Sequence, residues 1–282
     1  MDYLSALRKV LNNIFLIDNK DYIEKAKEVG INTFLFPFKG YAFGFNNYFE
    51  LDEINEENSY IYINRNLDCN DIDNLKQIFK NIKSNIKGVF FEDIGLIPVL
   101  ENTKLERIIF SHHLTTNYES INNYLKYVDS VIISTDITEE EMIEILDKSY
   151  KKLGIFSFGM IPLMYSRRTL LTNFNKVYER KNKNKEIALE PITKENFLFV
   201  ENEYGTVVYL NKYYANLNMK HQNIGFNLIN TYGLDKDDFD ELLLSFQEKR
   251  FPKLKNRETT EGFLYKKTIF KLPPKEVKWW II

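Results

Sequence analysis

Carboxyl and imidazole side chains follow several short apolar runs of this sequence. Such groups transfer protons in general acid–base catalysis. Neighbouring side chains on a strand point to opposite faces, so we expect only one member of an adjacent pair to enter a given pocket. The other member would cap the next segment, pack or face solvent. The predicted catalytic residues are Glu92, Asp93, His112 and Asp136.

A second set of polar side chains suits a binding surface. The segment MIPLMYSRR opens the most basic stretch of the chain, residues 165–185. Its aromatic rings could stack on bases, and its arginines could bind carboxylate or phosphate through two hydrogen bonds. A solvated loop rich in lysine and asparagine is the alternative for residues 181–185. The predicted substrate-binding residues are Asn64, His113, Tyr165, Arg167 and Arg168.

The chain has one cysteine, Cys69, and this excludes several kinds of site. A single thiol cannot form an internal disulfide, a four-cysteine zinc site or an iron–sulfur cluster. No HExxH spacing occurs, and we predict neither a cofactor nor a divalent metal ion. Cys69 stands at a predicted helix start, and we interpret it as a buried structural cysteine. Ser166 lacks the G-x-S-x-G pattern of an activated serine.

Charge and hydropathy limit the class of protein. The 38 basic and 40 acidic residues give a net charge of −2, which argues against a general nucleic-acid coat but leaves room for a local basic patch. No signal peptide is recognisable, and no run approaches the roughly 18 apolar residues of a spanning helix. The single cysteine fits a reducing compartment. We therefore expect a cytoplasmic protein without a membrane partner.

Short apolar runs alternate with helical periodicity along most of the chain. Strands are predicted at Ile14–Ile17, Thr33–Phe36, Tyr60–Ile63, Gly88–Phe91, Arg107–Phe110, Ser130–Ile133, Leu153–Phe158 and Ile224–Ile229. Helices are predicted at 21–29, 71–82, 121–128, 138–150 and 235–248, the fourth beginning at a capping box of Thr138 and Glu141. The alternation favours α/β architecture, and eight strands favour a (β/α)8 TIM-barrel-like fold over an open doubly wound sheet. Most of the predicted site residues then follow strand ends, where barrels hold their active sites.

One segment interrupts this alternation. Phe197–Val200 and Thr206–Leu210 predict a β-hairpin, and Gly262–Lys271 predicts one more strand near the end of the chain. We therefore expect a single barrel-like domain over residues 1–282, with residues 186–213 as an inserted β-hairpin segment.

Seven segments, in their order along the chain, resemble the collagenase-like peptidase family U32. They are YIYINRN, GVFFEDIGLIPVL, RIIFSHHLTTNYESINNYL, SVIISTDITEEEMIEI, MIPLMYSRRTLLTNF, ENFLFVENEYGTVVYLNKYYANL and GFLYKKTIFK. The resemblance implies a barrel-like fold and a peptidase. Relatives of this kind also act in hydroxylation of transfer RNA, ribosomal RNA or quinone precursors, and some bind an iron–sulfur cluster through four cysteines.

The chain departs from the cluster-binding relatives at their ligand positions. It has Pro162 and Thr169 where they have cysteines, and Phe158 where they have histidine. Cluster chemistry is therefore not implied for this chain. It resembles the short bacterial members that are similar to one half of a pair, whose longer partner holds the cysteines.

Three functions follow as hypotheses. The first is a peptidase that acts on a peptide substrate, as the family resemblance implies. The second is an auxiliary or substrate-binding subunit for transfer-RNA uridine hydroxylation, which would work with a longer cysteine-bearing paralogue; the basic stretch favours this one. The third is a non-catalytic binding module, in which Arg167→Ala or Arg168→Ala weakens binding of RNA or another ligand without any reaction.

Overall fold

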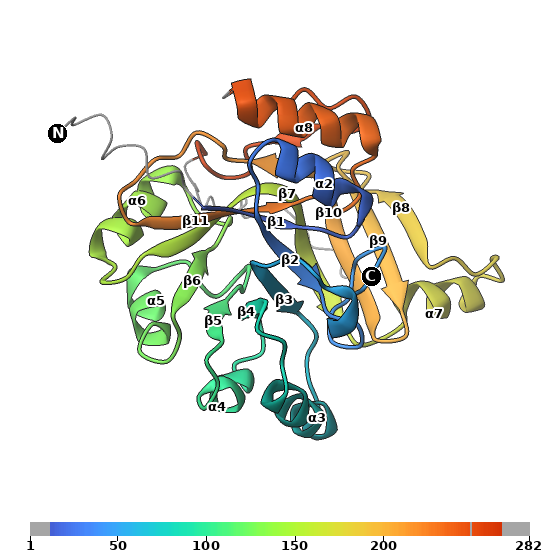
Figure 1. Cartoon of the computed structure of the whole chain (residues 1–282). Helices are drawn as coiled ribbons and strands as arrows, with labels where there is room; N and C mark the ends of the chain where they lie inside the picture. Colours follow the sequence, from blue (N-terminus) through green and yellow to red (C-terminus); the bar gives the residue numbers. More distant parts are fainter. Residues whose placement is uncertain (1–11, 249, 267–282) are drawn as a thin grey trace, which may run out of the picture.

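Eight parallel strands close into a barrel in the computed structural model, which describes residues 12–248 and 250–266 (Figure 1). The order around the barrel is β1–β2–β3–β4–β5–β6–β7–β11, and β11 pairs in parallel with both β7 and β1. The bounds are β1 Asn12–Leu16, β2 Thr33–Pro37, β3 Ser59–Ile63, β4 Ile86–Phe91, β5 Glu106–Ile109, β6 Ser130–Ile133, β7 Leu153–Ser166 and β11 Ile224–Asn230. The (β/α)8 TIM-barrel-like prediction is confirmed.

The barrel strands are apolar along their length because a parallel barrel buries both faces of each strand. All five residues of β3 are buried, as are the last four of β4. Gly154 of β7 lies directly against the Phe226 ring of β11, and a β-carbon at this position would collide with that ring. Large aromatic side chains therefore fill the inside of the barrel, leaving its two ends as the places where polar groups can gather.

Helices cover the outside of the barrel. Their bounds are α2 Asp21–Glu28, α3 Cys69–Lys80, α4 Leu96–Leu100, α5 Tyr118–Tyr124, α6 Glu139–Lys148 and α8 Lys236–Glu248. The predicted capping box at the start of α6 is confirmed, since the Thr138 and Glu141 side chains each accept a hydrogen bond from the other's backbone N–H. The rings of Tyr22 in α2 and Phe239 in α8 stack at 4.0 Å, and the two helices lie side by side (Figure 1).

The connection from β2 to β3 contains no α-helix. It contains only the short 3-10 helix η1, Leu51–Glu53, so residues 38–50 form a long loop at the C-terminal end of the barrel. Among the helices described, none has the length and apolar character to cross a membrane.

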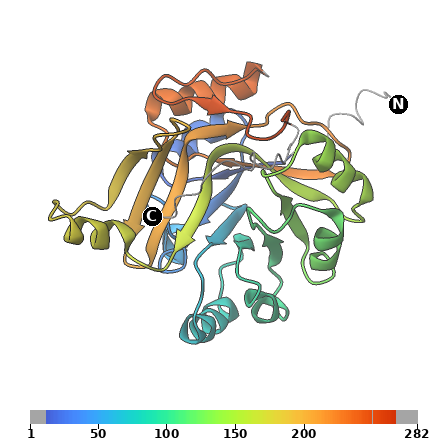
Figure 2. The same cartoon turned by 180° about the vertical axis from the view of Figure 1, so that it is seen from behind.

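Beyond the barrel, β7 continues into a small antiparallel sheet (Figure 2). This side sheet runs in the order β7–β10–β9–β8 with antiparallel pairing along that path, and the short β12 pairs in parallel with β10. The added elements are α7 Leu170–Val177, β8 Lys185–Leu189, β9 Asn196–Asn202, β10 Gly205–Ala215 and β12 Thr259–Thr260. Strands β9 and β10 form the predicted hairpin. The 14-residue length of β7 was not predicted, because the apolar run gives no sign that one strand serves both sheets.

Two interpretations of the sequence are wrong in the described residues. Cys69 is exposed, because it is the first residue of α3 and the buried face of that helix consists of Leu75 and Phe79. The predicted strand Gly262–Lys271 begins instead with turns over residues 262–265, and its part beyond residue 266 lies outside the described residues.

Candidate functional site

The carboxyl group of Glu92 lies at the C-terminal end of β4, in the mouth of the barrel. Tyr62 of the neighbouring strand β3 donates a hydrogen bond to its Oε1 over 3.1 Å. Burial raises the pKa of Glu92 from 4.5 to about 8, and the Tyr62 hydrogen bond opposes this rise only in part. Glu92 is therefore largely protonated at neutral pH and can donate a proton.

A second carboxyl group, that of Asp18, follows β1 at the same end of the barrel. It is buried, and the backbone N and side-chain Nδ2 of Asn46 donate to its Oδ2 over 3.2 and 3.0 Å. Burial raises its pKa to about 6, against the opposing effects of Asn46 and of the Lys185 charge. Within the described residues no donor bonds to Oδ1. Asp18 is therefore mostly ionised at pH 7 and retains a lone pair for a proton.

Asp18 was not among the predicted site residues. It directly follows the predicted strand Ile14–Ile17, which is the same signal that identified Glu92 after Gly88–Phe91. Applying the strand-end rule to the first strand as well would have found it.

Buried tyrosines line the same end of the barrel. The Tyr209 hydroxyl of β10 donates to Gly44 O over 3.1 Å, and the Tyr209 ring lies 5.4 Å from the ring of Tyr232, which follows β11. Burial, and then neighbouring groups that include Glu92 and Asp18, raise the Tyr209 pKa well above its ordinary value.

The loop that carries these contacts approaches the side sheet closely. Gly44 has a φ of +86°, and a β-carbon there would collide with the Tyr209 hydroxyl. A left-handed backbone at this position suits glycine alone at low cost. The β2–β3 loop is thereby held against β10, over the mouth of the barrel.

His112 is a neutral imidazole within an aromatic cluster. It is buried, with ring centroids 4.2 Å from Phe110 and 5.9 Å from Phe156. Burial, and to a smaller degree the charge of His113, lowers its pKa to about 3. Its Nδ1 is buried without a hydrogen-bond partner in the described residues. His112 therefore follows a strand end as predicted, but no hydrogen bond connects it to Glu92.

His113 and Asp136 form a separate pair nearer to solvent. His113 Nδ1 lies 2.7 Å from Asp136 Oδ2, and their side chains are 51% and 33% exposed. Both histidines lie in the turn after β5, where His113 is exposed and His112 is buried, so only one of the pair faces the interior. Within residues 12–248 and 250–266, no cluster of three or more potential metal-ligating side chains is found.

Two predicted site residues bind backbone groups. Asp93 accepts from Leu67 N over 3.1 Å and from Gly95 N over 2.9 Å, and it thereby holds the turn before α4, whose N-cap is Gly95. Asn64 accepts from Phe43 N over 2.9 Å and donates to Phe43 O over 3.2 Å. Their side chains fix the loops that frame the mouth.

The remaining predicted binding residues lie along the extension of β7. The Tyr165 ring stacks on Phe43 at 3.9 Å, and its hydroxyl donates to Tyr204 O over 2.8 Å. Arg167 and Arg168 are exposed, and their guanidinium groups form neither a hydrogen bond nor an ion pair within the described residues. The structure therefore places Tyr165 against the mouth loop and the two arginines farther out on the side sheet.

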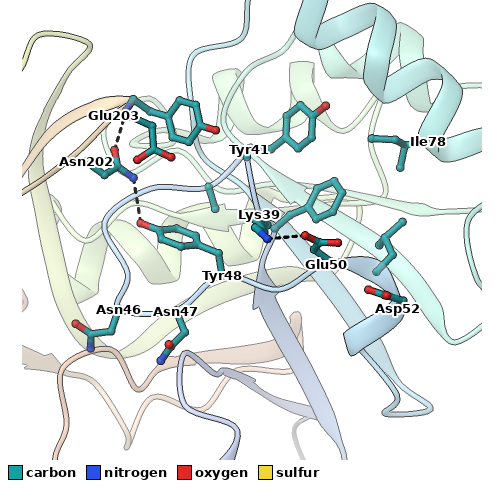
Figure 3. A pocket seen from close by; sticks show the side chains of 15 residues that line it. Lys39, Tyr41, Asn46, Asn47, Tyr48, Glu50, Asp52, Ile78, Asn202 and Glu203 are labelled. Atoms are coloured by element: carbon teal, nitrogen blue, oxygen red, sulfur yellow. Dashed lines mark hydrogen bonds and ion pairs between the residues drawn. The ribbon is translucent and has the colours of Figure 1, made fainter.

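An open cavity of about 780 Å³ lies beside the mouth, between the β2–β3 loop, α3 and the β9–β10 turn (Figure 3). Tyr48 accepts a hydrogen bond from Asn202 Nδ2 over 3.3 Å across it. On its inner side, the Arg65 guanidinium lies 4.4 Å from the Tyr204 ring and 5.7 Å from the Tyr41 ring. Aromatic and amide side chains of this kind are typical of binding grooves. None of the predicted site residues lines this cavity.

A search of solved structures gives matches to three enzymes. The chitinase of Chromobacterium violaceum is 10% identical, and the match covers 84% of this chain and 98% of that one with a TM-score of 0.39. The spore cortex-lytic enzyme SleL of Bacillus cereus is 13% identical, with 89% and 75% covered and a TM-score of 0.40. SleL of Bacillus megaterium is 10% identical, with the same coverage and a TM-score of 0.42. No curated protein sequence matches the chain.

A sequence comparison with protein families gives a match to peptidase family U32 over residues 45–214. The matched region is more than half of the chain. It runs from the β2–β3 loop to β10 and includes Glu92, His112 and the two arginines of the side sheet, whereas Asp18 precedes it. The chain belongs to peptidase family U32.

Proposed function

We propose that this chain is a peptide hydrolase that uses Glu92 as general acid and Asp18 as general base. The single observation that carries this proposal is that two enclosed carboxyl groups, Asp18 after β1 and Glu92 after β4, lie at the same barrel mouth, where burial raises the pKa of Asp18 to about 6 and that of Glu92 to about 8. Environments that separate the pKa values of two such groups are typical of acid–base pairs. Membership of a peptidase family supports a peptide as the substrate.

The proposed reaction needs no further proton carrier. Ionised Asp18 takes a proton from a water molecule, whose oxygen attacks the carbonyl carbon of the peptide bond. Glu92 gives its proton to the amide nitrogen as the carbon–nitrogen bond breaks. Exchange with solvent then removes the proton from Asp18 and returns one to Glu92. The buried tyrosines around the pair limit access of bulk water, which strengthens the electrostatic effect of each carboxyl.

The test is the pH profile of peptide cleavage. With gelatin and a mixed peptide pool as substrates, we expect kcat/KM to rise as Asp18 ionises near pH 6 and to fall as Glu92 ionises near pH 8. Glu92→Gln should lower the rate roughly 10²- to 10⁴-fold and remove the alkaline limb. Asp18→Asn should remove the acidic limb.

A matched control lies at the other end of the barrel. There the Tyr60 hydroxyl donates to Glu106 Oε2 over 2.9 Å, in the same pairing as Tyr62 and Glu92. Glu106→Gln should leave cleavage unchanged. Absence of cleavage by the wild-type protein, or cleavage that survives both Glu92→Gln and Asp18→Asn, would overturn the proposal.

The surface of α7 favours a second candidate, an RNA-binding auxiliary subunit for transfer-RNA uridine hydroxylation that works with a longer cysteine-bearing paralogue. Phe174 and Tyr178 are 45% and 64% exposed, and their rings lie 4.6 Å apart. Arg167 and Arg168, just before α7, are free to contact phosphates. Exposed rings beside free arginines suit a single-stranded nucleic acid.

Binding of transfer RNA, measured by filter retention at several salt concentrations, tests this second candidate. Loss of both arginines in Arg167→Ala/Arg168→Ala should weaken binding and make the salt dependence less steep. Lys87→Ala, at the opposite end of the barrel, is the control. If the wild-type protein binds no transfer RNA, or if the double variant binds it equally well, the second candidate is wrong.

A further inference from the structure

Arg257 is a half-buried arginine without a carboxylate partner in the described residues. Three other half-buried arginines each pair with an acidic side chain: Arg65 with Asp71, Arg107 with Asp129 and Arg250 with Glu241. Among the described residues, the Arg257 side chain makes one hydrogen bond, to Met160 Sδ over 2.8 Å. A thioether is a weak acceptor, so this contact does little to balance the guanidinium charge.

Lys185 is a second cation without a partner at the same place. It is the first residue of β8, and within the described residues its Nζ makes no hydrogen bond and no ion pair. Its Nζ lies 5.5 Å from the ring of Tyr232, and the Arg257 guanidinium lies 5.6 Å from the ring of Tyr213. The Tyr213 hydroxyl donates to Tyr232 O over 3.0 Å, so the Tyr213 side chain reaches the backbone of Tyr232.

Both cations lie beside the Tyr232–Gly233 segment, Lys185 at the Tyr232 ring and Arg257 at Gly233. Burial lowers the pKa of Lys185 first, and the charge of Arg257 lowers it further, while Asp18 acts in the opposite direction. The backbone at Gly233, which follows Tyr232, lies beneath the guanidinium, since a β-carbon there would be 3.4 Å from Nη1. Repulsion of this kind is relieved when an anion binds between the charges.

We propose that Lys185 and Arg257 form a subsite for a singly charged carboxylate, beside Asp18 at the mouth of the barrel. Two cations and one ionised Asp18 leave a net charge of +1. A singly charged anion neutralises this charge, whereas a phosphate dianion would leave a net negative charge. The guanidinium supplies a two-pronged donor for the carboxylate, and Lys185 supplies a point charge from the other side. Lys185 is exposed along part of its length, so solutes can reach it.

This subsite names the substrate class for the proposed hydrolase, and in that respect it rests on the proposed function. Peptides with a free carboxylate close to the bond that is cleaved would place that carboxylate on the subsite. Binding of a carboxylate can be measured without turnover, however, so the subsite and the hydrolysis can fail separately.

N-acetylglycine, which carries the carboxylate of a peptide end, is the probe, and chemical shifts of the isotope-labelled full chain at pH 7 are the measurement. We expect a Kd of roughly 1 mM for N-acetylglycine and no detectable binding of its neutral amide. Lys185→Gln and Arg257→Gln should each weaken binding roughly tenfold, as expected for loss of a charge-assisted hydrogen bond. Lys183→Gln, two residues from β8 and exposed, is the control that should bind normally.

Three outcomes would overturn the subsite. Equal binding of the acid and its amide would show that charge is not recognised. Tighter binding of inorganic phosphate than of N-acetylglycine would show a phosphate site in place of a carboxylate site. Unchanged binding by Lys185→Gln would show that the carboxylate binds elsewhere; this variant alters an exposed side chain, so it remains informative should Arg257→Gln not fold.

Discussion

The Tyr62 hydroxyl lies 3.1 Å from Glu92 Oε1, and this hydrogen bond is the one direct polar contact that the described residues make with the Glu92 side chain. Tyr62 is fully enclosed near the end of β3, and burial, followed by the neighbouring Glu92 carboxyl, raises its own pKa well above the ordinary value. Tyr62 therefore remains a donor throughout the physiological pH range. The pair fixes where the Glu92 proton is held.

Removing that donor tests its effect on Glu92. In Tyr62→Phe we expect the pKa of Glu92 to rise further, because the hydrogen bond favours the ionised form and opposes the effect of burial. The free energy of unfolding should fall by about 1 kcal/mol, as for a typical hydrogen bond. Carboxyl carbon NMR of the labelled protein would follow the titration. Tyr60→Phe is the control and should leave the Glu92 titration in place; a lower Glu92 pKa in Tyr62→Phe would contradict this account.

The raised pKa of Glu92 predicts how stability depends on pH. Its folded pKa of about 8 exceeds the ordinary value of 4.5, so the stability it contributes is complete below pH 4.5 and is lost as the pH rises through 8. Each pKa unit of the rise corresponds to about 1.4 kcal/mol of unfolding free energy. Because the Glu92 side chain is only partly buried, the total loss of stability is on the order of 2 kcal/mol. Urea unfolding at pH 5 and pH 8 should show this loss in the wild type and a smaller one in Glu92→Gln. Equal losses in both proteins would rule out Glu92 as the cause.

The Asn64 side chain should matter for the loop over the mouth rather than for chemistry. Asn64→Ala leaves the N–H and C=O of buried Phe43 without their partners, at a cost of about 2 kcal/mol. We expect a lower urea midpoint and faster hydrogen exchange at the Phe43 amide. Asn66→Ala, two residues along and exposed, should change neither. Slow exchange at Phe43 in the Asn64 variant would show that other contacts hold the loop.

Glu201 of β9 fastens α7 to the side sheet. Its Oε2 accepts from Leu171 N and Thr206 Oγ1, each over 2.7 Å, and its Oε1 accepts from Thr172 N over 3.1 Å. Burial raises the pKa of Glu201, but these hydrogen bonds outweigh burial and hold it below 4.5. The stability it provides is therefore present above pH 4.5 and is lost as the pH falls through the lower folded value.

Substitution of Glu201 should loosen α7 selectively. In Glu201→Gln at pH 7 we expect a loss of about 2 kcal/mol and faster hydrogen exchange at Leu171 and Thr172, because hydrogen bonds to an ionised acceptor become weaker neutral ones. At acid pH the difference from the wild type should shrink. Glu203→Gln, in the exposed turn that follows β9, is the control for unfolding and exchange. Protection of α7 that persists in Glu201→Gln would contradict the role of this carboxylate.

The sequence by itself determined the barrel and one of its two carboxyl groups. Parallel strands buried on both faces must be apolar, so the runs at Tyr60–Ile63 and Gly88–Phe91 were recognisable, and the polar residue that ends each run had to lie at the mouth. Glu92 was found in this way. The capping box of Thr138 and Glu141 was equally visible, because its two partners are three residues apart.

Only the tertiary structure decided what those residues can do. The contact of Tyr209 with Gly44 spans 165 positions, and that of Asn46 with Asp18 spans 28, so no local pattern reports them. A pKa depends on how deeply a group is enclosed and on which charges surround it, and both follow from packing. For the same reason the sequence could not distinguish Lys185, which reaches the mouth of the barrel, from the surface lysines of the same basic stretch.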